Sequence, residues 1–253
     1  MSVREASIED GGLGHCVWDS GVALSIWLSM NARETVHGRR VLELGSGVGI
    51  TGIAALLAGA TSAVLSDFIP QGESTRASMQ DGTSEEDAAK QAATLLELLP
   101  YNAEISGVEP AIVTTMGLDW NQCLDESFQA AERFPVVIGS GVLVAGGGRT
   151  SNPFAPSSFS HHALTFCRLS LFIADLIYEL DTAKALCAAV LKHIADDGVL
   201  YLMCQTGRPG VTEVHRLLEE AGSLTIQDFV LENDYGVTDV MLATFRPDPC
   251  QER

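Results

Sequence analysis

The chain has 253 residues, of which 46% are hydrophobic and 19% charged, which is enough for one α/β domain with a substantial core and excludes wholesale disorder. Fifteen Lys and Arg face 33 Asp and Glu, and the formal charge of −18 argues against nucleic acid as a partner and for a basic one. No apolar run could span a bilayer and no signal peptide is evident, so we expect a cytoplasmic or nuclear protein without membrane contact. The six cysteines form no CxxC pair, so we expect no metal site. We expect one monomeric domain over residues 1–253.

The first elements are typical of a helix followed by two strand-helix units. Residues 20–30 have helical apolar spacing, and residues 40–44 form a short apolar strand that ends in a glycine cluster. Residues 50–58 follow as a helix stopped by Gly59, and residues 63–68 predict a second strand. This order predicts neighbouring parallel strands joined by a crossover helix.

The alternation continues after a polar segment and closes with two consecutive strands. Residues 70–92 predict a polar loop insertion that is rich in Gly, Ser, Thr and acidic residues up to residue 89. The remaining expected elements are helix 94–105, strand 111–116, a helical stretch at 125–133, strand 136–139, helix 181–195 closed by Gly198, strand 199–204, helix 211–221, and strands 224–231 and 239–245. We therefore predict an α/β fold: a Rossmann-like, seven-stranded, mostly parallel sheet with a C-terminal antiparallel hairpin and helices on both faces.

The glycine cluster after the first strand predicts close contact with a ligand. Gly45, Gly47 and Gly49 lack a Cβ, so the backbone there can approach a bound molecule at the start of a helix. Residues 47–52 also satisfy the dinucleotide pattern GxGxxG, and Asp67 stands 20 residues after Gly47, where a ribose-binding acid is expected. Spacing alone therefore leaves two alternatives open: a loop that binds a nicotinamide cofactor, and a glycine turn that binds nothing.

Two features favour S-adenosylmethionine over a dinucleotide. Glu43 precedes the loop, where a carboxylate would attract the positive amino-acid end of S-adenosylmethionine and repel a pyrophosphate. The terminal hairpin also differs from the parallel second half of a dinucleotide fold. A methyltransferase is therefore favoured over an oxidoreductase.

Four motifs resemble those of the family-16 methyltransferases, which include methyltransferase-like protein-lysine methyltransferases. In order, they are VWDS at 17–20, VLELGSG at 41–47, Asp67, and LDW at 118–120. The resemblance implies that Trp18 borders S-adenosylmethionine, that Gly45, Ser46 and Gly47 contact it through the backbone, that Asp67 takes the ribose hydroxyls, and that Trp120 flanks the adenine beside Asp119. We add Gly49 and Ser140 to this cofactor-binding set. Core packing for the two tryptophans and helix capping for Asp67 stay open as alternatives.

The acidic-aromatic motif DxxY of this family is interrupted here. Residues 134–140 resemble the strand before it, but Asp175 and Tyr178 come only after residues 141–174, which contain no acidic residue. We interpret this block as an atypical insertion, either disordered or intronic sequence translated in the gene model, with a genuine long loop as the alternative. Residues 136–144 and 171–178 compete for the fourth strand, and we favour 136–140. Asp175 and Tyr178 are then the expected catalytic residues, orienting a lysine by charge and cation–π contact, with strand-end packing as the alternative.

The sequence thus predicts an S-adenosylmethionine-dependent methyltransferase that modifies lysine in a basic protein. Three alternatives stay open: an NAD-dependent oxidoreductase, a catalytically impaired cofactor-binding or scaffold protein, and a small-molecule methyltransferase.

Overall fold

The computed structural model describes residues 1–5, 16–68, 85–140, 180–207, 209–233 and 236–248. The predictions for residues 70–84 and 141–174, and for the catalytic pair Asp175 and Tyr178, lie outside these residues. In the described part, no helix combines the length and apolarity that crossing a bilayer requires.

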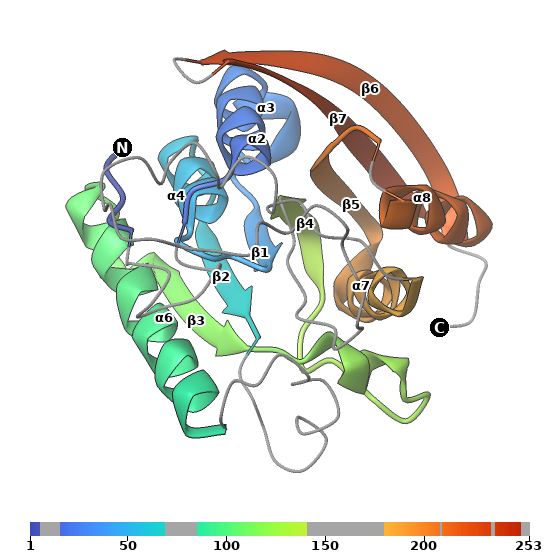
Figure 1. The fold of residues 1–253 in the computed structure, drawn as a ribbon, viewed down its shortest axis with the longest axis horizontal. Helices are drawn as coiled ribbons and strands as arrows, with labels where there is room; N and C mark the ends of the chain where they lie inside the picture. The colour runs from blue at the N-terminus through green and yellow to red at the C-terminus, as the bar shows by residue number, and fades with distance from the viewer. Residues whose placement is uncertain (6–15, 69–84, 141–179, 208, 234–235, 249–253) are drawn as a thin grey trace, which may run out of the picture.

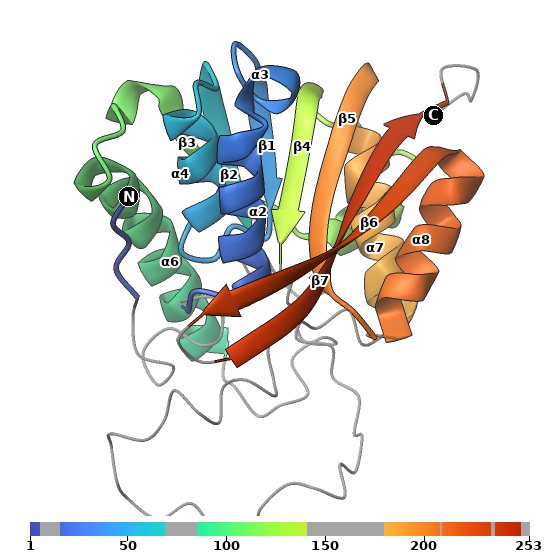
Figure 2. The same ribbon diagram turned by 90° about the horizontal axis from the view of Figure 1, so that it is seen from above.

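Seven strands form one sheet in the order β3-β2-β1-β4-β5-β7-β6 (Figures 1 and 2). The pairs from β3 to β5 are parallel, and β7 runs antiparallel to both β5 and β6. The strands are β1 (Arg40–Leu44), β2 (Ser62–Asp67), β3 (Val113–Gly117), β4 (Phe134–Ser140), β5 (Ile194–Gln205), β6 (Gly222–Asn233) and β7 (Gly236–Pro247). The predicted fold class, with its C-terminal hairpin, is confirmed.

Helices cover both faces of the sheet because successive strand residues point to opposite sides. On one face, Val41 of β1 packs with side chains of α2, α4 and α6; on the other, Leu42 packs with side chains of α7 and α8. The helices are α2 (Asp19–Met30), α3 (Ala32–Thr35), α4 (Ile50–Leu57), α6 (Glu85–Ile105), α7 (Leu180–His193) and α8 (Pro209–Ala221), with short 3-10 helices η2 (Pro110–Ile112) and η3 (Trp120–Leu124). The sheet is therefore buried between two apolar layers.

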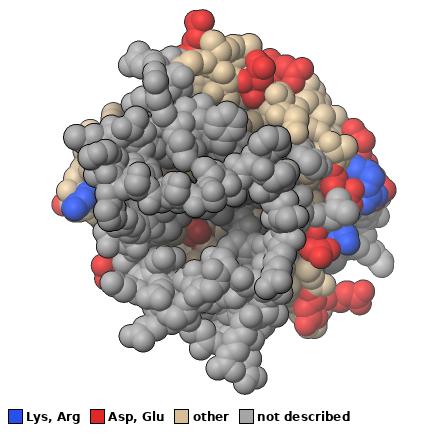
Figure 3. All heavy atoms as spheres, viewed as in Figure 1, with Lys and Arg blue, Asp and Glu red and all other residues tan. Residues whose placement is uncertain are grey.

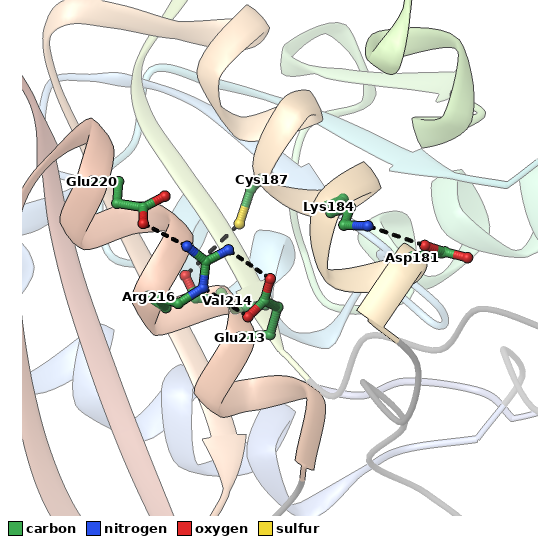
Figure 4. A network of polar contacts seen from close by, with 7 residues as sticks. All are labelled: Asp181, Lys184, Cys187, Glu213, Val214, Arg216 and Glu220. Atoms are coloured by element: carbon green, nitrogen blue, oxygen red, sulfur yellow. Dashed lines mark hydrogen bonds and ion pairs between the residues drawn. The ribbon is translucent and has the colours of Figure 1, made fainter.

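Figure 4 shows a buried contact between α7 and α8 and the ion pairs on the surface of α8. The buried Cys187 thiol of α7 donates to the Val214 carbonyl of α8 at 3.8 Å. On α8 itself, Arg216 pairs with Glu213 at 2.7 Å and also with Glu220. Because water screens the exposed Arg216 guanidinium, these ion pairs contribute little to stability, and apolar burial holds this layer together.

Two predicted helix boundaries and one predicted helix were wrong for local reasons. Helix α6 begins at Glu85, not at residue 94, because the sequence EEDAAKQAA combines acidic residues in the first turn with strong helix formers. Residues 125–133 are not helical: the Asp125 carboxylate accepts the Ser127 N–H at 2.8 Å and turns the chain there. Helix α7 ends at His193, not at residue 195, and Gly198 lies inside β5.

The early start of β5 follows from its pairing with β4. Phe134 pairs with Ile194 and Val136 with Val199, so the extra residues of β5 form an irregularity in the ladder. An ion pair of 3.0 Å between Arg133 and Asp196 lies beside it. Strand pairing of a buried isoleucine here prevails over continuation of the helix.

Candidate functional site

The carboxyl ends of three parallel strands place the predicted cofactor residues at one edge of the sheet. Leu44, the last residue of β1, pairs with Ser66 of β2 on one side and with Gly139 of β4 on the other. The glycine loop, Asp67 and Ser140 therefore follow one another along this edge. The strand order reverses between β1 and β4, which is where open α/β sheets bind ligands.

The glycine loop has a backbone that only glycine adopts readily. Gly45, Gly47 and Gly49 have φ angles of 68°, 52° and 81°. Gly49 is the N-cap of α4, and a Cβ added to it would lie 2.8 Å from Cδ2 of Leu99. The glycines thus serve both the turn itself and the close packing of α6 against it.

Protein oxygens already accept three N–H groups of the loop. The Ser46 N–H donates to the Ser66 carbonyl at 2.9 Å, the Gly47 N–H to Oδ2 of Asp67 at 2.7 Å, and the Gly49 N–H to the Ser46 carbonyl at 2.7 Å. A loop that binds pyrophosphate presents such donors to the ligand instead. This arrangement argues against the dinucleotide alternative.

Glu43 lies beneath the loop and supports it from inside. Its side chain is 1% exposed, and Oε2 accepts the Gly52 N–H of α4 at 3.1 Å. Burial raises the pKa of this carboxyl to about 8, although the hydrogen bond from Gly52 opposes the shift. The carboxyl group therefore contacts the first turn of α4, and its predicted contact with the amino-acid end of the cofactor stays a prediction.

Asp67 ties the end of β2 to the loop. Oδ2 accepts the Gly47 N–H, and Oδ1 accepts the Phe68 N–H at 2.7 Å. Burial raises the pKa of this half-buried carboxyl, and both hydrogen bonds act in the opposite direction. Asp67 holds the loop and its own neighbour and caps no helix terminus in the described part, since the N-cap of α4 is Gly49 without a side-chain hydrogen bond. Its position at the sheet edge is the one expected of a ribose-binding acid, and that role stays a prediction.

A group of hydroxyls lines the inner side of the loop. Oγ1 of Thr51, which is 0% exposed, lies 3.0 Å from Oγ of Ser140. The buried Ser46 hydroxyl faces Glu43, whose pKa it lowers by hydrogen bonding, and it has no other partner in the described part of the chain. Its oxygen can therefore still accept a hydrogen bond from a polar group of a ligand.

Trp18 enters the site with the first turn of α2. It is the half-buried N-cap of that helix, and its carbonyl accepts the Val22 N–H at 3.1 Å. The turn packs tightly on the loop helix: a Cβ added to Gly21 would lie 3.0 Å from Cγ2 of Ile50 and 3.3 Å from Oγ of Ser140. The structure thus brings the start of α2 to the tip of β4.

The segment after β3 lies beside Asp67. The Leu118 N–H donates to the Asp67 carbonyl at 2.9 Å. The Asp119 carboxylate caps η3 by accepting the Asn121 N–H at 2.9 Å. Trp120 is 7% exposed and belongs to the core layer of α7 and α8, so core packing is at least part of its role.

Sequence reasoning missed four residues that shape this site. Thr51, Gly52, Leu99 and Asn102 all contact the loop or the group beneath it. One signal was available: Asn102 is a polar residue on the helix face that also carries Leu99 and Ala103, and a buried amide there needs a specific partner.

Known proteins with similar sequences are lysine methyltransferases. The family model described as lysine methyltransferase matches residues 1–83, which include α2, the glycine loop and Asp67. The electron transfer flavoprotein beta subunit lysine methyltransferase of Xenopus laevis is 25% identical over 91% of this chain and 68% of its own length. The mouse protein N-lysine methyltransferase METTL21A is 32% identical over 52% of this chain, and the alignment covers 49% of that protein.

Solved structures agree on the fold. A methyltransferase from Agrobacterium tumefaciens that depends on S-adenosylmethionine superposes with a TM-score of 0.52 at 13% identity, over 92% of this chain and 64% of that one. A protein of Thermoplasma acidophilum gives 0.50 at 12% identity, over 90% and 85%. The chain is therefore a relative of the lysine methyltransferases, built on the class I S-adenosylmethionine-dependent methyltransferase fold.

Proposed function

We propose that the chain transfers the methyl group of S-adenosylmethionine to the side-chain nitrogen of a lysine in a protein. The observation that carries this proposal is the glycine loop after β1, which offers its Ser46, Gly47 and Gly49 N–H groups to protein oxygens. A sulfonium cofactor has no phosphate that would need those donors. The match of residues 1–83 to the lysine methyltransferases supports lysine as the acceptor.

The described residues fit S-adenosylmethionine. The Ser46 hydroxyl, which has only Glu43 as a partner in the described part, can accept a hydrogen bond from a polar group of the cofactor. The glycines with positive φ angles leave no side chains along the loop. We assign the ribose to Asp67 and the border of the cofactor to Trp18. The adenine is assigned to the segment of Asp119 and Trp120.

The cofactor supplies an electrophilic methyl group, and the chain supplies alignment. In the transfer the carbon–sulfur bond breaks, a carbon–nitrogen bond forms, S-adenosylhomocysteine leaves, and the amine releases its proton to solvent. In-line alignment of donor and acceptor is the main contribution that a protein can make to such a displacement. We propose that Asp175 and Tyr178 hold the lysine, the carboxylate by charge and the ring by cation–π contact.

A basic protein is the partner that the charge favours. The formal charge of −18 attracts Lys- and Arg-rich surfaces and repels nucleic acid. On the face drawn in Figure 3, acidic side chains recur along the upper and right-hand rim with fewer basic ones between them. We extend the proposal to a monomer in the cytoplasm or nucleus, which gel filtration and cell fractionation would test.

Binding and transfer assays test the two halves of the proposal separately. Isothermal titration should detect S-adenosylmethionine and no binding of NAD; the reverse would refute the cofactor assignment. Radiolabelled methyl transfer to basic cytosolic proteins should place the label on lysine and weaken as salt rises. Asp67→Asn should reduce cofactor binding, whereas Asp125→Asn, at an exposed turn, is the matched control. Cofactor binding without any transfer would favour the scaffold alternative, and label on a small molecule would refute a protein acceptor.

A further inference from the structure

Asn102 is a buried amide whose hydrogen bonds reach two distant segments. It lies in the last turn of α6 and is 0% exposed. Its Nδ2 donates to the Val48 carbonyl at 2.9 Å and to the Arg4 carbonyl at 3.0 Å, while Oδ1 accepts the Arg4 N–H at 2.7 Å. Both ends of the amide are therefore satisfied by backbone groups, and one of these belongs to the glycine loop.

Helix α6 contacts two consecutive residues of the loop, Val48 and Gly49. Leu99 and Asn102 are three residues apart and share one face of the helix. Leu99 fills the space where a Cβ at Gly49 would be, and Asn102 holds the carbonyl of the residue before it. The outer side of the loop thus rests on one apolar and one polar contact from the same helix.

The N-terminal strap, defined here as residues 2–5, runs along α6 and continues this contact. Its Ser2 N–H donates to Oγ of Ser106 at 3.2 Å, and the Arg4 guanidinium lies 5.9 Å from the centre of the Tyr101 ring. Beyond Arg4, the Glu5 carboxylate accepts the Val17 N–H at 2.6 Å. The strap therefore connects Asn102 to the residue that precedes Trp18.

We propose that Asn102 is a positioning residue for the cofactor loop and that the N-terminal strap holds its amide in place. A loop with three glycines has high conformational freedom when it is not restrained. Fixing the Val48 carbonyl removes part of this freedom before the cofactor binds, so less ordering remains to oppose binding. This inference rests on the cofactor part of the proposed function and is independent of the methyl acceptor.

Two variants separate the loop contact from the strap. Asn102→Ala removes all three hydrogen bonds and should raise the Kd for S-adenosylmethionine about tenfold, which corresponds to about 1.4 kcal/mol. Arg4→Pro removes the Arg4 N–H and the guanidinium over Tyr101 but leaves the bond to Val48, so its Kd should rise two- to fourfold. Because proline substitutes an exposed residue outside helices and strands, this variant keeps the test available if Asn102→Ala does not fold.

The control must lose stability without touching the loop. Leu218 of α8 is 0% exposed and lies in the core layer on the opposite face of the sheet. Leu218→Ala should therefore lower Tm as much as Asn102→Ala or more, while its Kd for S-adenosylmethionine stays within twofold of the wild-type value.

Hydrogen exchange gives a second measurement that needs neither cofactor nor substrate. In the cofactor-free protein, amides 45–52 should exchange faster in Asn102→Ala than in the wild type, and at the wild-type rate in Leu218→Ala. The proposal is overturned if Asn102→Ala and Arg4→Pro both leave the Kd and the exchange of amides 45–52 unchanged. It is also overturned if Leu218→Ala raises the Kd as much as Asn102→Ala does. Absence of lysine methylation would contradict the proposed function and leave these results intact.

Discussion

Replacement of Glu43 by glutamine tests the strongest electrostatic feature of the site. Glutamine has nearly the same shape, and its Oε1 can still accept the Gly52 N–H. The substitution therefore removes the titration of a buried carboxyl while keeping its hydrogen bond to α4. Any difference that depends on pH between the two proteins then reports the charge of Glu43.

The sign and size of the effect follow from the pKa. Burial raises the pKa of Glu43 from 4.5 to about 8, so between these values the folded protein holds a proton that the unfolded chain has lost. Stability then falls as pH rises, by about 1 kcal/mol per pH unit, or about 2–3 kcal/mol from pH 5.5 to 7.5. His193, whose pKa is lowered by burial, has the opposite effect below pH 6.5, and Asp67 acts in the same direction as Glu43. Both groups remain in Glu43→Gln, so the difference between the two proteins reports the titration of Glu43 together with its charge coupling to Asp67.

Urea denaturation between pH 5.5 and 8.5, followed by circular dichroism, measures this difference. At pH 5.5 the variant should already be the more stable protein by about 1–2 kcal/mol, because the unfolded wild-type chain loses its proton above pH 4.5, and the difference should widen as pH rises. Glu97→Gln, at an exposed position of α6, should keep the wild-type dependence. Parallel curves for Glu43→Gln and the wild type would refute the assignment of a buried, protonated carboxyl.

Further substitutions at four positions test the packing of the site by denaturation. Gly52→Ala places a Cβ 2.2 Å from Cδ2 of Leu65, a clash that should cost about 1–3 kcal/mol and disturb the hydrogen bond from Gly52 to Glu43. This cost should outweigh the gain in helix propensity of about 1 kcal/mol. Equal or greater stability would contradict this packing. Trp120→Ala should lower the free energy of unfolding by about 3–5 kcal/mol. Trp18→Ala, at a half-buried cap, should lower it by less than half as much and mainly reduce cofactor binding. Equal losses of stability would count against these two roles. Ser140→Ala removes the partner of a fully buried Thr51 hydroxyl and should cost about 1–2 kcal/mol, unlike Ser140→Thr, and a neutral result would show that this hydrogen bond contributes nothing.

Patterns of apolar spacing predicted the sheet well because strand burial is local information. β1 and β4 were located to within two residues, and the terminal hairpin was predicted with its antiparallel direction. The short runs at residues 40–44 and 136–139 are apolar on both faces, as central parallel strands must be. The position of Asp67 at the edge followed from strand order alone.

The support of the loop could not be predicted because it depends on contacts far apart in the sequence. Asn102 meets Val48 across 54 residues, so its place on the apolar face of α6 could indicate burial but not its partner. Glu43 was predicted to face the ligand because it precedes the glycines. The structure turns its side chain toward Gly52, since a strand residue adjacent to a crossover helix lies under the first turn of that helix.

The contacts around the loop separate cofactor binding from turnover. The loop and the start of α4 are held by Asp67 of β2 at the Gly47 N–H, by Glu43 of β1 at the Gly52 N–H, and by Asn102 of α6. All three supports precede Ser140, after which the family-like motif is interrupted. Because they fix the loop without help from the acceptor side, we expect S-adenosylmethionine to bind whether or not transfer occurs. A protein that binds the cofactor without transferring its methyl group would place the defect after Ser140, and loss of both would place it in the loop.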